Sequence, residues 1–201
     1  MPILYDDPIS GNGYKVRLLL AQLDFSYELV ELDILNQETH TPDFLAKNAN
    51  GKIPTIELDD GRCLSESNAI LFYFAQGSRY WPGEKFDQAD VMRWMCFEQY
   101  SHEPYVAVAR FLHHLPEAPD PEVIAEKHAK GYVALDVMEQ HLGENDFFAA
   151  GQYSIADIAL YAYTHVAEEG KFDLTSYSNI SKWLDRVSEQ PGFVPMGSKP
   201  N

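Results

Sequence analysis

The sequence predicts an α/β domain followed by an all-helical domain. In residues 1–78, short strand-like apolar segments alternate with helical patterns, whereas no strand signal follows the segment 79–86. That segment contains Trp81-Pro82-Gly83, which favours a break between regular elements. Apolar residues at helical spacing then dominate residues 87–201. We therefore expect domains at 1–78 and 87–201, joined by a linker at 79–86.

The first elements are predicted from short apolar runs and their spacing. Residues 3–5 are expected to form a strand, and 27–33 a second one. Between them, an apolar stripe at positions i, i+3, i+4 and i+7 predicts a helix; it consists of Val16, Leu19, Leu20 and Leu23. A short helix is expected over 42–47, because proline is accepted in a first helical turn.

A hairpin and a helix follow, at 51–65 and 67–75, with a tight turn at 59–61. Pro54 has no amide hydrogen and holds the preceding residue extended, so the backbone of Ile53 is left to pair with something alongside. Glu66 and Ser67 lie where a helix presents unpaired N–H groups, which suit a carboxylate. This combination predicts recognition of a small peptide. An ordinary strand–turn–helix unit is the alternative.

The pattern of apolar residues in the second half of the chain predicts helices and no strands. One helical stretch is expected over 87–114, with a kink possible at Pro104, and another over 121–142. Ser154 followed by Asp157 is typical of a capping box at a helix start. A last helix is predicted from its apolar residues, Ile180, Trp183, Leu184 and Val187.

Composition excludes several classes of protein. The formal charge of −16 over 201 residues disfavours nucleic acid and anionic membranes as partners. Cys63 and Cys96 do not form a disulfide framework, and we expect both to be buried in a protein of the reducing cytoplasm. No metal is expected, because the spacing of His102, His113 and His114 matches no known site and solvated side chains explain them better.

Two stretches, Gly51 to Leu58 and Cys63 to Ile70, resemble the glutathione-binding half of the glutathione transferase family, and the likeness extends over essentially the whole chain. The resemblance implies a thioredoxin-like first domain, an all-helical second domain and a cis bond before Pro54. It also implies that Ile53 pairs with the cysteinyl part of glutathione and that Ser67 takes the γ-glutamyl carboxylate near Glu66. Further glutathione contacts are expected, with lower specificity, from Lys52, Thr39 and His40.

The expected reactive loop lies between the first strand and the first helix. Redox proteins of this fold carry Cys-x-x-Cys there, whereas this chain has residues 10–13 without a thiol. The reacting sulfur would then belong to glutathione, and the hydroxyl of Ser10 and the amide of Asn12 would stabilise its thiolate together with the helix N-terminus. The loop resembles that of a bacterial, nu-class-like branch. Helix capping alone is the competing interpretation, and Tyr5 is a third-ranked thiolate donor.

The resemblance implies a homodimeric glutathione transferase that conjugates a small electrophile, reduces disulfides, or does both. Conjugation would give it a role in detoxification. In the second domain, Tyr105 and Arg110 are expected to face the electrophile pocket. The alternative is a binding or interaction module of the same fold with little turnover.

Overall fold

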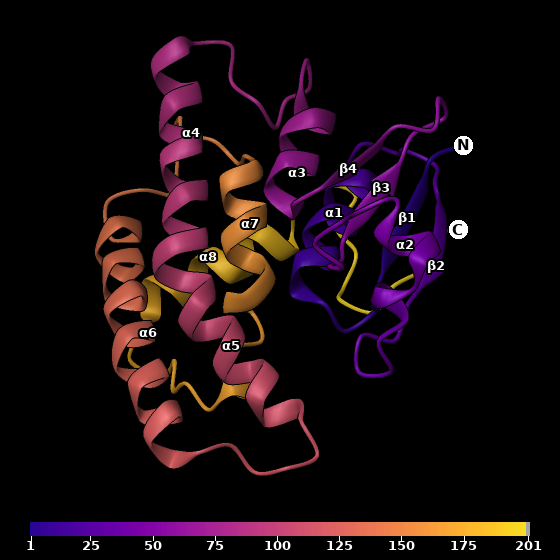
Figure 1. Cartoon of the computed structure of the whole chain (residues 1–201). Coiled ribbons are helices and arrows are strands. Elements are labelled where there is room, and N and C mark those ends of the chain that lie inside the picture. Colours follow the sequence, from indigo (N-terminus) through magenta and orange to yellow (C-terminus); the bar gives the residue numbers. More distant parts are fainter. Residues whose placement is uncertain (200–201) are drawn as a thin grey trace. The chain divides into compact units, whose positions relative to one another are not determined.

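The computed structural model describes residues 1–199 (Figure 1), which form two compact units. Unit 1 contains residues 1–78 together with the C-terminal tail, residues 191–199, and unit 2 is Arg79–Gln190. The tail was expected to belong to the helical domain. Instead, the Tyr14 hydroxyl donates a hydrogen bond to the carbonyl of Val194, 2.7 Å away, which ties the tail to unit 1.

Unit 1 has the expected alternation of strands and helices. Its elements are β1 (Ile3–Asp6), α1 (Gly11–Gln22), β2 (Glu28–Glu31), the 3-10 turn η1 (Glu38–His40), α2 (Pro42–Leu45), β3 (Thr55–Glu57), β4 (Cys63–Ser65) and α3 (Ser67–Ala75). The sheet order is β2-β1-β3-β4, and only the β1–β2 pair is parallel. This topology confirms the thioredoxin-like prediction. Strand β2 is shorter than the expected 27–33, and the proline-containing strand begins only at Thr55.

The core of unit 1 lies between the sheet and the helices α1 and α3, which pack against each other. Its buried cluster is Leu4, Val16, Leu20, Tyr27, Ile56 and Ile70. Val16 and Leu20 come from the predicted stripe of the first helix, and Ile70 comes from α3. Burial of this stripe fixes which face of α1 packs into the core.

Unit 2 is all-helical, as predicted, apart from a single β-bridge between Ala149 and Gln152. Its elements are α4 (Lys85–Phe97), η2 (Glu98–His102), α5 (Glu103–His114), α6 (Pro121–Leu142), α7 (Ile155–Thr164), the 3-10 turn η3 (Ala167–Gly170) and α8 (Ser178–Ser188). The helices α4 to α8 can be followed in Figure 1 by their labels.

The helical stretch expected over 87–114 is interrupted by η2, a π-helical segment that ends two residues before Pro104. Pro104 offers no amide hydrogen to the carbonyl four residues earlier, and its ring crowds that carbonyl. The wider π turn accommodates both effects, so the irregularity comes before the proline rather than as a simple kink at it.

Two expectations about burial were wrong. Cys96 is exposed, on α4, and Cys63 is only partly buried, on β4. His102 is fully buried rather than solvated, and its Nε2 lies 3.0 Å from the Thr164 hydroxyl. The hydrogen bond at Nε2 offsets part of the cost of burying the ring, and sequence spacing could not reveal the partner on α7.

None of the helices within residues 1–199 is long and apolar enough to cross a bilayer.

Candidate functional site

Ser10 caps helix α1. Its hydroxyl oxygen accepts a hydrogen bond from the Gly13 amide at 3.1 Å, and its own amide donates to the Asp7 carbonyl at 2.9 Å. Ser10 is therefore the N-cap of α1. Capping leaves room for a second role, because the cap uses an oxygen lone pair and the hydroxyl hydrogen can donate to another group.

Asn12 connects the two stretches of sequence that were expected to form the site. The Ser67 hydroxyl donates to Asn12 Oδ1 at 3.1 Å, across 55 positions of sequence. Ser67 opens α3 and is 5% exposed, whereas Asn12 lies in the first turn of α1. The N-termini of two helices therefore lie side by side, and both favour negative charge.

Glu66 precedes α3 with a positive φ of 68° and a ψ of 109°. This conformation lies outside the ordinary regions for a residue with a side chain, and such conformations persist only where the surroundings hold them. The Glu66 side chain is exposed beside the buried Ser67. The carboxylate of Glu66 is thus available to a cationic group of a ligand.

The Ile53–Pro54 bond is cis, as the resemblance implied. Within residues 1–199 the backbone amide of Ile53 has no hydrogen-bond partner. Asn48 supports this segment: its side-chain nitrogen donates to the Lys52 carbonyl at 2.7 Å and to the Thr55 hydroxyl at 3.1 Å. The extended backbone at Ile53 is therefore held open by its neighbours on both sides.

Thr39 and His40 lie against the same segment. Gly51 has a φ of +61°, and a Cβ added to it would lie 3.2 Å from both His40 Nε2 and the Thr39 carbonyl. Only glycine combines this conformation with such a close approach. The Thr39 hydroxyl lies 3.1 Å from His40 Nδ1, and His40 and Lys52 are exposed.

Tyr5 is engaged elsewhere in unit 1. Its hydroxyl donates to Glu57 Oε2 at 3.0 Å, and Lys47 pairs with the same carboxylate oxygen at 2.6 Å. Burial, followed by the hydrogen bond to Glu57, raises the pKa of the Tyr5 hydroxyl. A phenol whose hydrogen is already donated to a carboxylate is a poor donor for a thiolate, which supports ranking Tyr5 below Ser10 and Asn12.

Sequence reasoning missed a buried ion pair next to this site. Arg17 Nε lies 3.0 Å from Asp6 Oδ2, and both side chains are at most 2% exposed. The Asp6 carboxylate lies against Gly13: a Cβ added there would come within 1.7 Å of Asp6 Oδ1. The available signal was a charged residue, Arg17, inside the apolar run of the first helix.

The Asp6 carboxyl predicts a pH-dependent stability. Burial raises its pKa from 3.8 to about 7, although Arg17 acts in the opposite direction. The folded state therefore holds this proton more tightly than the unfolded chain does. The resulting stabilisation is present below pH 3.8 and is lost as the pH rises through about 7.

We expect Asp6→Asn to remove this pH dependence. The free energy of unfolding, measured with denaturant at about pH 5 and about pH 8, should rise with pH for Asp6→Asn relative to the unmodified protein. The rise should be roughly 1.4 kcal/mol for each pH unit between pH 5 and the folded-state pKa of about 7. Equal differences at both pH values would contradict the prediction.

Tyr105 and Arg110, the expected electrophile-pocket residues, both lie on α5 in unit 2. Arg110 is 7% exposed and pairs with Glu169 at 2.6 Å. Tyr105 is half-buried, and the ammonium groups of Lys127 and Lys130 lie 5.5 and 5.4 Å from its ring centroid. Among residues 1–199, no group of acidic, histidine and cysteine side chains has the arrangement of a metal site.

Comparison with known families matches both halves of the chain. Residues 3–76 match the glutathione S-transferase N-terminal domain, and residues 94–191 match the glutathione S-transferase C-terminal domain. The first match contains every expected residue of the glutathione site. The second contains Tyr105 and Arg110.

Solved structures and a curated relative agree with this result. The chain is 51% identical to a glutathione S-transferase from Pseudomonas fluorescens, with a TM-score of 0.95 over 97% of this chain and 98% of the other. It is 48% identical to a possible glutathione S-transferase from Rhodopseudomonas palustris, with a TM-score of 0.96 over 100% and 91%. The disulfide-bond oxidoreductase YfcG of Escherichia coli is 27% identical over 94% of this chain and 90% of its own length.

Proposed function

Because this chain belongs to the glutathione S-transferase family, we propose that it binds glutathione as a thiolate and directs the sulfur at an electrophilic carbon or at a disulfide. The observation that carries the proposal is the hydrogen bond between Ser67 and Asn12, which joins the expected carboxylate site to the expected thiolate site. One site can serve both electrophiles and disulfides, because the protein only has to stabilise the attacking sulfur.

Glutathione binding is proposed to rest on unit 1. The backbone of Ile53 would pair with the cysteinyl residue, as an added strand does. The backbone amide of Ser67 and the next amides of α3 would bind the γ-glutamyl carboxylate, because the Ser67 hydroxyl hydrogen is already donated to Asn12. Glu66 would bind the amine. The glycyl carboxylate would lie near Lys52, Thr39 and His40.

Thiolate formation is proposed to rest on Ser10 and Asn12. A thiol pKa near 8.5 must fall for the sulfur to be ionised at neutral pH, and donors at a helix N-terminus lower it. The Ser10 hydroxyl would donate its hydrogen while its oxygen keeps the cap. Asn12 accepts from Ser67 through its amide oxygen, so its amide nitrogen is the atom suited to the sulfur.

The disulfide branch needs no thiol from the protein. The glutathione thiolate would attack one sulfur of the substrate, forming a mixed disulfide and releasing the other sulfur as a thiolate, which takes up a proton. A second glutathione thiolate would then attack the glutathione sulfur of the mixed disulfide. This step releases the reduced substrate and oxidised glutathione. The likeness to a disulfide-bond oxidoreductase supports this branch.

The test is retention on immobilised glutathione followed by turnover with two substrates, a chlorinated aromatic and a small mixed disulfide. We expect retention and turnover of both, with the disulfide reduced faster. Faster conjugation would instead make the protein a general transferase. Retention without turnover would establish the alternative, a binding module. Failure to bind would refute the glutathione site at Ile53, Glu66 and Ser67.

We further propose that the protein acts as a cytoplasmic homodimer and that conjugation contributes to detoxification. Residues 1–78 would bind glutathione, 79–86 would link the domains, and the helical residues 87–190 would supply the electrophile pocket with Tyr105 and Arg110. Sedimentation velocity of the purified protein tests the dimer. Substitution of Tyr105 by alanine should alter the KM for the electrophile and leave the KM for glutathione unchanged.

A further inference from the structure

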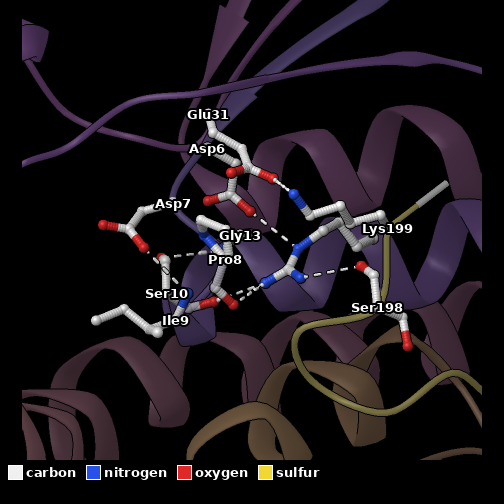
Figure 2. A network of polar contacts seen from close by, with 10 residues as sticks. Asp6, Asp7, Pro8, Ile9, Ser10, Gly13, Glu31, Ser198 and Lys199 are labelled. Carbon is white, nitrogen blue, oxygen red and sulfur yellow. Dashed lines mark hydrogen bonds and ion pairs between the residues drawn. The ribbon is translucent and has the colours of Figure 1, made fainter.

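The buried guanidinium of Arg17 contacts three segments of unit 1 that are separate in the sequence. Besides its 3.0 Å contact with Asp6, it donates through Nη2 to the Pro8 carbonyl at 2.9 Å and to the Ser10 carbonyl at 3.4 Å. Its Nη1 donates to the Ser198 carbonyl at 3.4 Å. Figure 2 shows these contacts converging from the end of β1, the loop before α1 and the C-terminal tail.

The two loop carbonyls held by Arg17 lie on either side of Ile9 and lead into Ser10. The planar guanidinium presents its donors in a rigid fork, so one side chain can fix several oxygen atoms in direction as well as in distance. The loop is further closed by the Ile9 amide, which donates to Asp7 Oδ1 at 3.0 Å. Arg17 therefore holds the backbone on both sides of Ile9, from which the Ser10 side chain projects.

Whenever the Asp6 carboxyl is ionised, Arg17 also balances its negative charge at the start of α1. The Asp6 carboxylate packs against Gly13 in the first turn, the same turn whose amides would face a thiolate. A carboxylate in this position, without a counter-charge, would oppose a second negative charge nearby. The buried guanidinium offsets this repulsion, so that the partial positive charge of the helix N-terminus can still stabilise a thiolate.

The tail adds contacts that hold it against α1 and β2. Tyr14 binds the Val194 carbonyl, and Lys199 pairs with Glu31 at 2.6 Å. Gly192 has a φ of +76°, and a Cβ there would lie 2.9 Å from the Cα of Gln22. These contacts bring the Ser198 carbonyl to within 3.4 Å of Arg17 Nη1.

We propose that Arg17 is a positioning residue of the glutathione site, which orients Ser10 through the carbonyls of Pro8 and Ser10 and neutralises Asp6, and that the tail supports Arg17 through Ser198. This inference rests on the proposed function, because it assigns Arg17 a role in stabilising the glutathione thiolate. Arg17 acts through Ser10 and the first turn of α1, without touching the ligand.

Arg17→Lys tests the proposal, because lysine keeps the positive charge and loses the fork. We expect kcat to fall about ten-fold or more, since a small misplacement of a reacting group is costly. The pKa of the thiol of bound glutathione, followed by its thiolate absorbance, should rise by about one unit. The KM for glutathione should change less than kcat, because Ile53 and Ser67 are untouched.

Arg62→Lys is the matched control, because Arg62 forms an exposed pair with Asp60 at 2.7 Å in the turn between β3 and β4. It should behave like the unmodified protein in kcat, thiol pKa and thermal midpoint. A chain ending at Gly197, which lacks Ser198, should raise the thiol pKa in the same direction as Arg17→Lys but by less. An unchanged thiol pKa in that chain would overturn the role of the tail.

The positioning role would be overturned if Arg17→Lys lowered the thermal midpoint but left kcat and the thiol pKa of bound glutathione as in the unmodified protein. If Arg17→Lys does not fold, the double variant Asp6→Asn with Arg17→Gln is used to test the proposal. It replaces the buried ion pair with two neutral side chains, so that no unpaired charge is left buried. It must lose kcat if the fork positions Ser10, and an unchanged kcat overturns the proposal. An unmodified protein that fails to bind glutathione would instead refute the proposed function.

Discussion

Ser10→Ala is expected to lower kcat about 100-fold, the scale of loss seen when one hydrogen-bond donor to a developing or bound anion is removed. The KM for glutathione should change little, because binding is proposed to rest on Ile53, Glu66 and Ser67. The pKa of the bound thiol should rise, since the ionised sulfur loses a donor. Steady-state kinetics and the pH dependence of thiolate absorbance measure these effects.

Two further variants separate the donor from the cap, because alanine removes both. Glycine at this position caps a helix almost as well as serine but has no hydroxyl, so Ser10→Gly should be as inactive as Ser10→Ala and more stable. Ser10→Thr keeps the hydroxyl and should retain most activity. Recovery of kcat in Ser10→Gly would show that Ser10 acts only as a cap.

Local signals predicted most helix boundaries. Helix α6 begins at Pro121 after the cap residue Asp120 and ends before Gly143, and α3 occupies the expected residues 67–75. Each boundary depends on side chains within a turn of it, and such information is contained in a short window of sequence. The π-helical segment before Pro104 was missed because a proline indicates only that a helix is disturbed, without indicating how.

The candidate site was only partly predictable. The resemblance selected Ser10, Asn12 and Ser67, and the structure adds that the last two share a hydrogen bond. The ion pair of Asp6 and Arg17 was not predicted, because a charged residue within an apolar run gives no indication of which partner folding brings to it. The same limit explains His102, whose partner Thr164 lies 62 positions away.

Asp157→Ala is expected to cause the largest loss of stability, about 4 kcal/mol in the free energy of unfolding, because several buried donors lose their acceptor at once. The fully buried carboxylate accepts from the amide and hydroxyl of Ser154 at 3.0 and 3.2 Å. It also accepts from the Phe148 amide at 3.1 Å and from Trp183 Nε1 at 3.0 Å. Asp157 therefore fixes the start of α7, the preceding loop and α8 together, whereas the sequence predicted the cap alone.

Asp120→Ala is the matched control, because Asp120 is also a capping aspartate of unit 2. Its side chain is exposed and, within residues 1–199, accepts only from the Glu122 amide, at 2.8 Å. It should cost about 1 kcal/mol. Trp183→Phe keeps an aromatic ring and removes one donor to Asp157, so it should cost less than Asp157→Ala. Denaturant unfolding measures all three variants. Equal losses for Asp157→Ala and Asp120→Ala would mean that the bonds to Phe148 and Trp183 contribute nothing beyond an ordinary helix cap.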